Sequence, residues 1–584
     1  MDNPGLTKDE DIKMSSADRF TTIPGKLSMD DGNKIEQDNL VNLKRTLGLF
    51  GSISLIVGSM MGSGIFVSPG GIFENTNSVW FGLIVWAVCG VLSICVWFGL
   101  IVWAVCGVLS ICGGITYIEL STVVPSSGAE YSYILSAFGS VPGFLTAWAS
   151  LVMIKPTSTA TSCIAFAQYS MDPFVDDVKA IPWAVKLMTV AVILFLTFVN
   201  CYSAKLGAKV QIFFTVAKLV AIGVVVGSGI YNLIIGKTSY LKQDFDQIEW
   251  NMGKIAAAFF GGFYAYDGWN QLNFVTEEIK NPYKNLPRGI FIGLPLVGVC
   301  YLLANVSFLT VMTMQEVIDA PSVATIFGER MLGVMSFIMP LSVAMSAFGT
   351  ANGGLFTSAR VTYVAGREGH LPDVLGYVHM TRNTPASSLV VNCVVATALT
   401  MTLELQELIK FFGFTTWLIY GSTACAMIVM RYTKPNANRP FKAPLWMAGV
   451  VILMSGFLII ASLVLDPRME YLYSAIFILC GLLFYIPFVH FQVKLPGSDI
   501  LTTGIQKILM VVPPEGLWLL VAVVLSNAYT DKLTLDLTAE KPAQGLETID
   551  VLEKVDIMFA FIPEVKKYAA QMSQRYGGNV STHD

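Results

Sequence analysis

Two short segments interrupt long apolar runs with residue types that could hold a small polar molecule. Gly62-Ser63-Gly64 lies inside the first apolar run, residues 46–74, and a second break, GGFYAYDGWN, covers Gly261 to Asn270 and includes Asp267. Glycine disfavours a helix by roughly 1 kcal/mol relative to alanine, so we expect both helices to be interrupted. An interrupted helix leaves N–H and C=O groups that other groups or a ligand must satisfy.

The groups released by the two breaks are complementary to the two charged groups of an amino acid. A half-helix that begins near Ser63 directs its free N–H groups and positive dipole end at a carboxylate. Carbonyl groups at the end of the preceding half-helix and in the second break could accept from an ammonium. For the first motif, close helix packing on small residues is an alternative. The residues predicted to bind substrate here are Ser59, Met60, Gly62, Ser63, Gly64, Ile65, Tyr264, Ala265 and Asp267.

Ionisable residues inside apolar spans cost roughly 2.5–3.5 kcal/mol on insertion scales, so each is a candidate for function. Asp267 could face a cationic group of a substrate, cap the second half-helix, or do both. Lys218, in the run QIFFTVAKLVAIG, could substitute for a bound sodium ion in the bundle core, or tether carbonyls of the broken helix. Tyr264 is expected to act as a gate beside the site, with ordinary packing as the alternative. Lys155 is expected to be structural.

The elements that must position these residues are predicted to be membrane-spanning helices. The chain has 584 residues, of which 54% are hydrophobic and only 13% are charged, a composition that excludes a soluble globular protein. A helix needs about 20 apolar residues to span a membrane. We therefore predict an all-α polytopic membrane protein with twelve transmembrane helices. The candidate spans are 46–74, 79–118, 141–168, 183–203, 206–235, 252–276, 286–312, 334–360, 386–405, 408–431, 444–465 and 470–493.

The two breaks lie at equivalent depths in the first and sixth spans, a pattern that points to the substrate site of a transporter. It predicts two five-span repeats of opposite orientation followed by two further spans; two unrelated glycine kinks are the alternative. An excess of Lys and Arg in the loops on the N-terminal side predicts that both termini are cytoplasmic. The predicted units are an N-terminal tail (1–45), a transporter domain (46–494) and a C-terminal tail (495–584).

The second span contains an exact tandem duplication. VWFGLIVWAVCGVLSIC occupies residues 79–95 and again residues 96–112. The apolar stretch would be roughly 58 Å long at about 1.5 Å per residue, nearly twice the ~30 Å hydrocarbon core. Because the second copy continues directly into GGITYIEL, we take it as the working span and residues 79–95 as surplus.

The sequence indicates no enzyme, no metal site and no cofactor. The four histidines are scattered, the ten cysteines fall within apolar spans without metal-ligand spacing, and no nucleophile–base constellation is visible. No predicted outside loop contains a cysteine, so a disulfide framework is not expected.

Several longer motifs are specific enough to indicate a family. They are IVGSMMGSGIFVSP, PSSGAEYSY, WASLVMIKPTS, YAYDGWNQLNFVTEEIKNPYKNLP, ANGGLFTSAR and YVAGREGHLP. From about Leu47 to Pro514 the chain resembles the L-type light chains of heteromeric amino acid transporters, in the amino acid–polyamine–organocation superfamily. AYDGWNQLN, IKPTS and VVPPE are most similar to the branch that exchanges cystine and cationic amino acids for neutral ones. The resemblance implies the LeuT-type fold, with broken helices 1 and 6, and obligatory exchange by alternating access.

The resemblance also implies roles for individual residues. Ser63 and Gly64 would bind the substrate carboxylate, while backbone carbonyls of Met60, Tyr264 and Asp267 would face its ammonium. The residues that would line the side-chain pocket are Asn270, Thr350 and Thr416.

One departure from the family concerns its partner. The light chains usually carry a cysteine in the outside loop after span three, bonded to a single-span glycoprotein heavy chain. Here the loop reads DPFVDDVKAIP, with Val178 at the expected place. Any heavy chain is therefore expected to bind without a covalent link.

The leading functional hypothesis is a sodium-independent exchanger of neutral and cationic L-amino acids in the plasma membrane, with cystine as a further candidate substrate. Two alternatives remain open: a proton-coupled amino acid symporter that uses Lys218 or Asp267, and a membrane sensor that binds amino acids without transporting them.

Overall fold

The computed structural model is helical almost throughout the part of the chain that it describes. Ser63, Val178 and the first copy of the duplicated segment, 79–95, lie outside the described residues, as does most of both predicted tails. The described residues are 45, 47–62, 64–65, 98–175, 181–237, 240, 259, 261–319, 323–403, 405–464, 469–493 and 497–513.

Six of the described helices are long and apolar enough to cross a membrane, judged by length and composition. They lie in α4 (Phe98–Val123), α8 (Pro182–Tyr202), α9 (Ala204–Ile234), α11 (Pro282–Leu309), α16 (Leu405–Thr433), and α18 (Met469–Phe484) with η11 (Tyr485–His490). Shorter apolar helices are α1 (Leu49–Met60), α15 (Ala386–Thr402) and α17 (Leu445–Val464). This agrees with the predicted polytopic helical membrane protein. The second copy of the duplicated segment contributes the start of α4.

The long helix α14 (Ile338–Arg367) is an inner helix although it carries many polar side chains. It contacts α1, α7, α9 and α15. Its polar groups are buried and bonded to neighbours: the Asn352 amide donates to the Gly207 carbonyl (3.1 Å) and the Gln211 side chain (3.0 Å). Buried polar groups need such partners. Mean hydropathy therefore understates how deeply this helix is buried.

The segment predicted as span three, 141–168, is helical but irregular. It corresponds to α6 (Ser140–Ala149), the π-helical turn η4 (Ser150–Ile154) and α7 (Lys155–Met171), and the short helix α5 (Glu130–Phe138) precedes it. Gly139 separates α5 from α6 with φ +88°, a conformation that glycine adopts without strain. Several polar residues of PSSGAEYSY, at the start of α5, are nevertheless buried, among them Ser127, Glu130 and Ser132.

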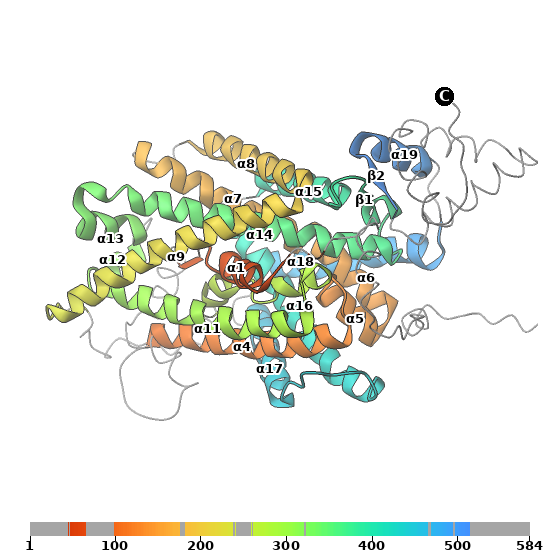
Figure 1. Cartoon of the computed structure of the whole chain (residues 1–584), viewed down its shortest axis with the longest axis horizontal. Coiled ribbons are helices and arrows are strands. Elements are labelled where there is room, and N and C mark those ends of the chain that lie inside the picture. The colour runs from red at the N-terminus through yellow and green to blue at the C-terminus, as the bar shows by residue number, and fades with distance from the viewer. Residues whose placement is uncertain are drawn as a thin grey trace, which may run out of the picture.

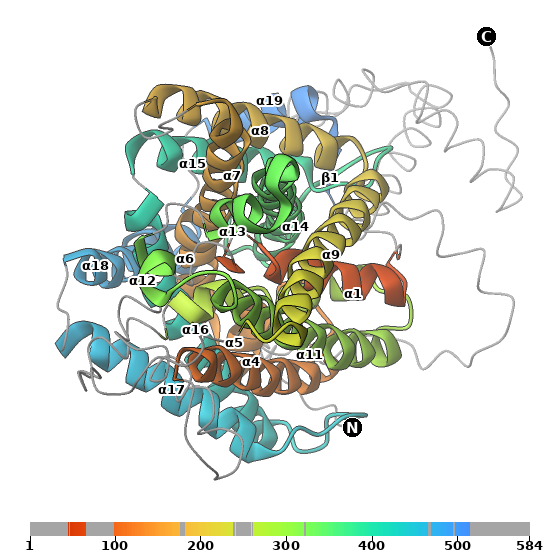
Figure 2. The ribbon, with the colours of Figure 1, turned by 90° about the vertical axis from the view of Figure 1, so that its left-hand side faces the viewer.

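The helices surround the first broken helix. Figure 1 shows α1 near the centre of the bundle, and α1 contacts α9, α11 and α14. Viewed from the side in Figure 2, α8 and α15 lie at one face and α17 at the opposite face. Helix α4 packs on α11 and α17, and α16 also packs on α17. Helix α1, which carries the first break, is therefore packed against other helices on several sides.

Part of the predicted C-terminal tail folds back on the bundle. Helix α19 (Ser498–Leu509) leads into β2 (Val511–Val512), which pairs antiparallel with β1 (Val378–His379). The sequence offered no signal for this two-residue pairing. The remaining short elements are η5 (Asp172–Phe174), η8 (Gln271–Glu278), α12 (Met314–Asp319), α13 (Val323–Leu332), η9 (Gly333–Met335) and η10 (Asp373–Gly376).

Candidate functional site

The first broken helix ends where its glycines predict. Helix α1 stops at Met60, and Met61 adopts φ −74°, ψ 72°, outside the helical region. The Gly62 N–H donates to the Met60 carbonyl (2.8 Å) instead of continuing the helix. Gly64 is helical again, and a β-carbon there would lie 2.8 Å from the Ala265 α-carbon. Glycine is needed at this position because the two breaks approach each other closely.

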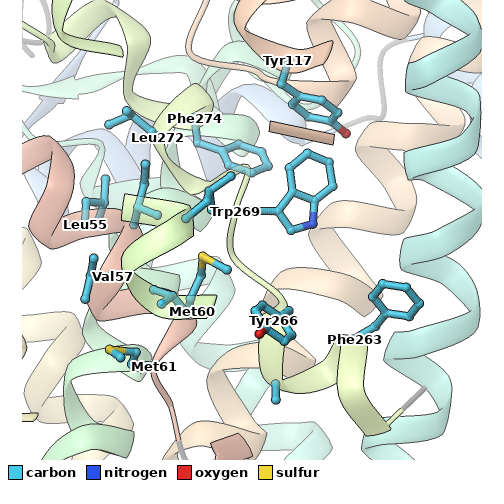
Figure 3. Packing of buried hydrophobic residues seen from close by; sticks show 14 of the residues in the cluster. Leu55, Val57, Met60, Met61, Tyr117, Phe263, Tyr266, Trp269, Leu272 and Phe274 are labelled. Carbon is cyan, nitrogen blue, oxygen red and sulfur yellow. The ribbon is translucent and has the colours of Figure 1, made fainter. Parts of the chain in front are cut away.

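The second break faces the first. Residues 261–266 are helical, residues 267–270 form a turn, and η8 follows. Gly268 has φ +108°, and a β-carbon there would lie 3.3 Å from the Met60 nitrogen. Figure 3 shows the uncoiled chain between Tyr266 and Trp269 beside Met60 and Met61 at the end of α1. The two predicted breaks therefore form one locus in the bundle.

Lys218 reaches this locus from α9. Its ammonium donates to the carbonyls of Gly58 and Met61, both at 2.6 Å, and lies 3.3 Å from the Ser346 carbonyl. The Ser346 hydroxyl also donates to Met61 (2.7 Å). Carbonyls freed at the end of α1 are thus satisfied by a buried side-chain cation. This geometry fits both predicted roles, a sodium substitute and a tether.

Tyr301, on α11, joins the two breaks, and sequence reasoning missed it. Its hydroxyl lies within hydrogen-bond distance of the Met60 carbonyl (2.6 Å) and of the Ala265 carbonyl (2.9 Å). Both carbonyls were predicted to face a substrate ammonium, and the single hydroxyl hydrogen of Tyr301 can be donated to one of them at a time. A carbonyl oxygen has two lone pairs, so a second donor can still bind. A tyrosine in an apolar run gives no signal that separates this role from ordinary packing.

Asp267 lies in the turn between the two parts of the second broken helix. The Tyr420 hydroxyl, from α16, donates to its carboxylate (2.6 Å), and the Gly268 N–H interacts with the same group. The N-cap residue of η8 is Asn270, not Asp267, and within the described residues its side chain makes no capping bond. The carboxylate is therefore directed mainly at α16 and at the cavities described next.

Two adjoining cavities meet at Asp267. The first, here the break cavity, measures about 520 Å³ and is lined by Ser59, Met60, Gly62, Gly64, Tyr264 and Thr350. The second, the side cavity, measures about 420 Å³ and is lined by Glu130, Lys155, Asn270, Phe274, Thr416 and Tyr420. Asp267, Gln271, Ser158, Gly354 and Phe412 line both.

Most of the predicted site residues therefore lie together. Ile65 and Ala265 are buried next to the cavities but line neither of them, and Ser63 is outside the described residues. Tyr264 borders the break cavity, is partly exposed and makes an edge contact with the Phe412 ring. Sequence reasoning missed Glu130, Gln271 and Tyr420, and it treated Lys155 as structural.

Ion pairs hold the end of the second broken helix below the cavities. Glu278 pairs with Arg360 of α14 (2.7 Å), and both side chains are 1% exposed. Glu277 pairs with Arg367 (3.1 Å) and accepts from the Ser127 N–H. The Leu47 N–H donates to the Glu278 carbonyl (3.0 Å). Removing one partner of the buried Glu278–Arg360 pair would leave an uncompensated charge, so this pair ties the end of η8 to α14.

Comparisons with known proteins agree with this architecture. The family model described as amino acid permease matches residues 47–486, which contain both breaks and both cavities. The chain is 43% identical to the Homo sapiens b(0,+)-type amino acid transporter 1 over 482 residues, which cover 82% of this chain and 96% of the relative. It is 39% identical to the Homo sapiens large neutral amino acids transporter small subunit 2, over 81% of this chain and 87% of the relative.

These matches cover 96% and 87% of the two relatives, and the resemblance to the L-type light chains is confirmed. They also agree with the prediction of a transporter rather than an enzyme. With a broken-helix site at the centre of its helical bundle, this chain is a membrane-spanning member of the amino acid permease family.

Proposed function

We propose that the protein is a sodium-independent exchanger that moves neutral and cationic L-amino acids by alternating access. The observation that carries this proposal is the position of Lys218, whose ammonium lies on the freed carbonyls of Gly58 and Met61. A fixed cation there leaves no role for a bound metal cation at the same carbonyls. The substrate carboxylate would bind the N–H groups at Ser63 and Gly64, and its ammonium the carbonyls of the second break.

The proposal includes a specific topology. Twelve spans, arranged as two inverted five-span repeats and two further helices, would place both termini in the cytoplasm of a plasma-membrane protein. The facing breaks of α1 and of residues 261–270 support the repeat, because inverted repeats bring two discontinuous helices together at the substrate site. The paired residues Glu278 and Arg360 would then lie on the cytoplasmic side of a closed inner gate.

We also propose a broad substrate range. One set of relatives is named as b(0,+)-type transporters and another as transporters of large neutral amino acids. Asp267 at the junction of the two cavities would favour cationic side chains, with cystine as a further candidate. One relative is named as a small subunit, which supports a second, heavy-chain subunit for this chain too. With Val178 in place of cysteine, that partner would bind non-covalently.

Counterflow in proteoliposomes tests the proposal. Purified protein is reconstituted, vesicles are loaded with leucine or left empty, and uptake of labelled leucine and arginine is measured in sodium or choline buffer. We expect uptake only into loaded vesicles, equal in both buffers and unaffected by a pH gradient. Uptake driven into empty vesicles by a pH gradient would instead indicate the proton-coupled symporter. Binding of amino acids without uptake in either condition would indicate the sensor.

A further inference from the structure

Lys155 is brought to the side cavity by an irregularity in its own helix. The π-helical turn Ser150–Ile154 precedes it directly, and Pro156 follows it. Proline cannot donate a backbone hydrogen bond, so the regular helical ladder is interrupted here. Single π-helical turns inside α-helices occur frequently at functional sites. The irregular backbone at IKPTS thus determines where along the helix the Lys155 side chain projects into the side cavity.

The Lys155 ammonium is buried, and among the described residues it contacts an aromatic ring rather than a hydrogen-bond acceptor. The residue is 6% exposed, and its Nζ lies 3.5 Å from the centroid of the Phe274 ring. Glu130 and Asp267 attract it electrostatically. Within the described residues, however, it forms neither an ion pair within 4 Å nor a hydrogen bond to a side chain or carbonyl. A ring face stabilises an ammonium but leaves its three N–H donors unused.

Two other polar atoms that line the side cavity have no hydrogen-bond partner among the described residues. The Asn270 amide donates to Glu130, but its carbonyl oxygen is buried without a partner. The Thr416 hydroxyl is likewise buried without a partner. Native proteins rarely leave buried polar groups unpaired, so such groups on the wall of a cavity are open to a ligand or to water. The side cavity therefore offers one cationic donor, one carbonyl acceptor and one hydroxyl.

We propose that Lys155 is a specificity-determining residue that donates a hydrogen bond to the side chain of the substrate, and that the side cavity selects side chains carrying a carboxamide. A carboxamide oxygen would accept from Lys155, and its NH₂ group would donate to the free oxygen of Asn270. The ammonium also offsets one of the two carboxylates, Glu130 and Asp267, so that neutral substrates are not excluded. This inference rests on the proposed function, because it assumes that an amino acid occupies the break cavity.

The first test uses the unaltered protein. Glutamine and homoleucine have nearly the same shape, but only glutamine carries the carboxamide. In reconstituted vesicles loaded with leucine, glutamine should compete with labelled leucine about tenfold better than homoleucine, since a hydrogen bond to a charged group contributes on that order. Equal competition by the two amino acids would overturn the proposal. Absence of any leucine exchange would instead contradict the proposed function.

The second test uses Lys155→Met, which keeps the length of the side chain and removes its donors and charge. Relative to leucine in the same variant, we expect the preference for glutamine over homoleucine to disappear and arginine to compete about tenfold better. Lys209→Met, which removes an exposed lysine of α9, is the matched control and should retain the preference of the unaltered protein. An unchanged preference in Lys155→Met would overturn the proposal. If that variant does not fold, the comparison of glutamine with homoleucine still decides.

Discussion

Replacing Asp267 by Asn should separate cationic from neutral substrates. Asparagine keeps a side-chain oxygen that can accept from the Tyr420 hydroxyl, which now donates to the carboxylate at 2.6 Å. The change therefore removes a negative charge while preserving the local packing. A carboxylate that pairs with a substrate cation in a partly dry site stabilises it, but drying both ions offsets much of that gain. Lys155 already attracts the same carboxylate, which limits the effect further.

From this balance we expect Asp267→Asn to weaken lysine or arginine uptake by about ten- to hundredfold, which corresponds to about 1.4–2.7 kcal/mol. Leucine uptake should fall by much less, because an uncharged side chain gains nothing from the carboxylate. The assay is initial uptake into loaded proteoliposomes over a range of concentrations, with protein per vesicle measured for each variant. An equal loss for arginine and leucine would refute the reasoning. Asp267 would then only position the turn, and the cationic preference would have another source.

Three further changes test other parts of the structure. Tyr301→Phe removes the hydroxyl that reaches the Met60 and Ala265 carbonyls, and it should slow leucine exchange about tenfold at equal protein amount; an unchanged rate would show that the two breaks do not need this link. Burial lowers the pKa of His370, in the loop after α14, to about 4, so the unfolded state binds more protons than the folded state between pH 6.5 and 4. Acidification across that window should therefore lower the melting temperature. The decrease should be smaller in His370→Gln, which cannot take up this proton. Deleting residues 79–95 should leave an exchanger with at least normal surface expression, and loss of expression would show that this copy is needed.

The two breaks could be predicted because their cause is local. Gly62 and Gly64 weaken a helix wherever it is placed, and an acid such as Asp267 inside an apolar run requires a reason to be there. Lys218 could be singled out on the same ground. These residues are found where the prediction placed them, at the end of α1, in the turn after residue 266, and on α9 beside both.

The missed residues depend on tertiary contacts that no local pattern records. Tyr301 is one of many tyrosines in apolar runs, and only its distance to two carbonyls distinguishes it. Glu130 precedes the predicted third span, in a segment that reads as a polar loop, yet it is 4% exposed and lines the side cavity. Glu130 lies in the short helix α5, and a polar segment of this kind gives no sign in the sequence that it packs inside the bundle.

How well the role of a charged residue could be predicted depends on which partner neutralises it in the folded bundle. The sequence shows which charges lie in apolar surroundings, but only the fold shows which of them are neutralised. Lys218 is satisfied by carbonyls, and Glu278 is satisfied by Arg360. Lys155 is also buried, and among the described residues its ammonium contacts the Phe274 ring while Glu130 and Asp267 attract it from the same cavity. Burying an ammonium without a hydrogen-bond acceptor is costly, so a role in binding a ligand explains Lys155 at the cavity wall better than packing does. Experiments on substrate specificity should therefore begin with Lys155.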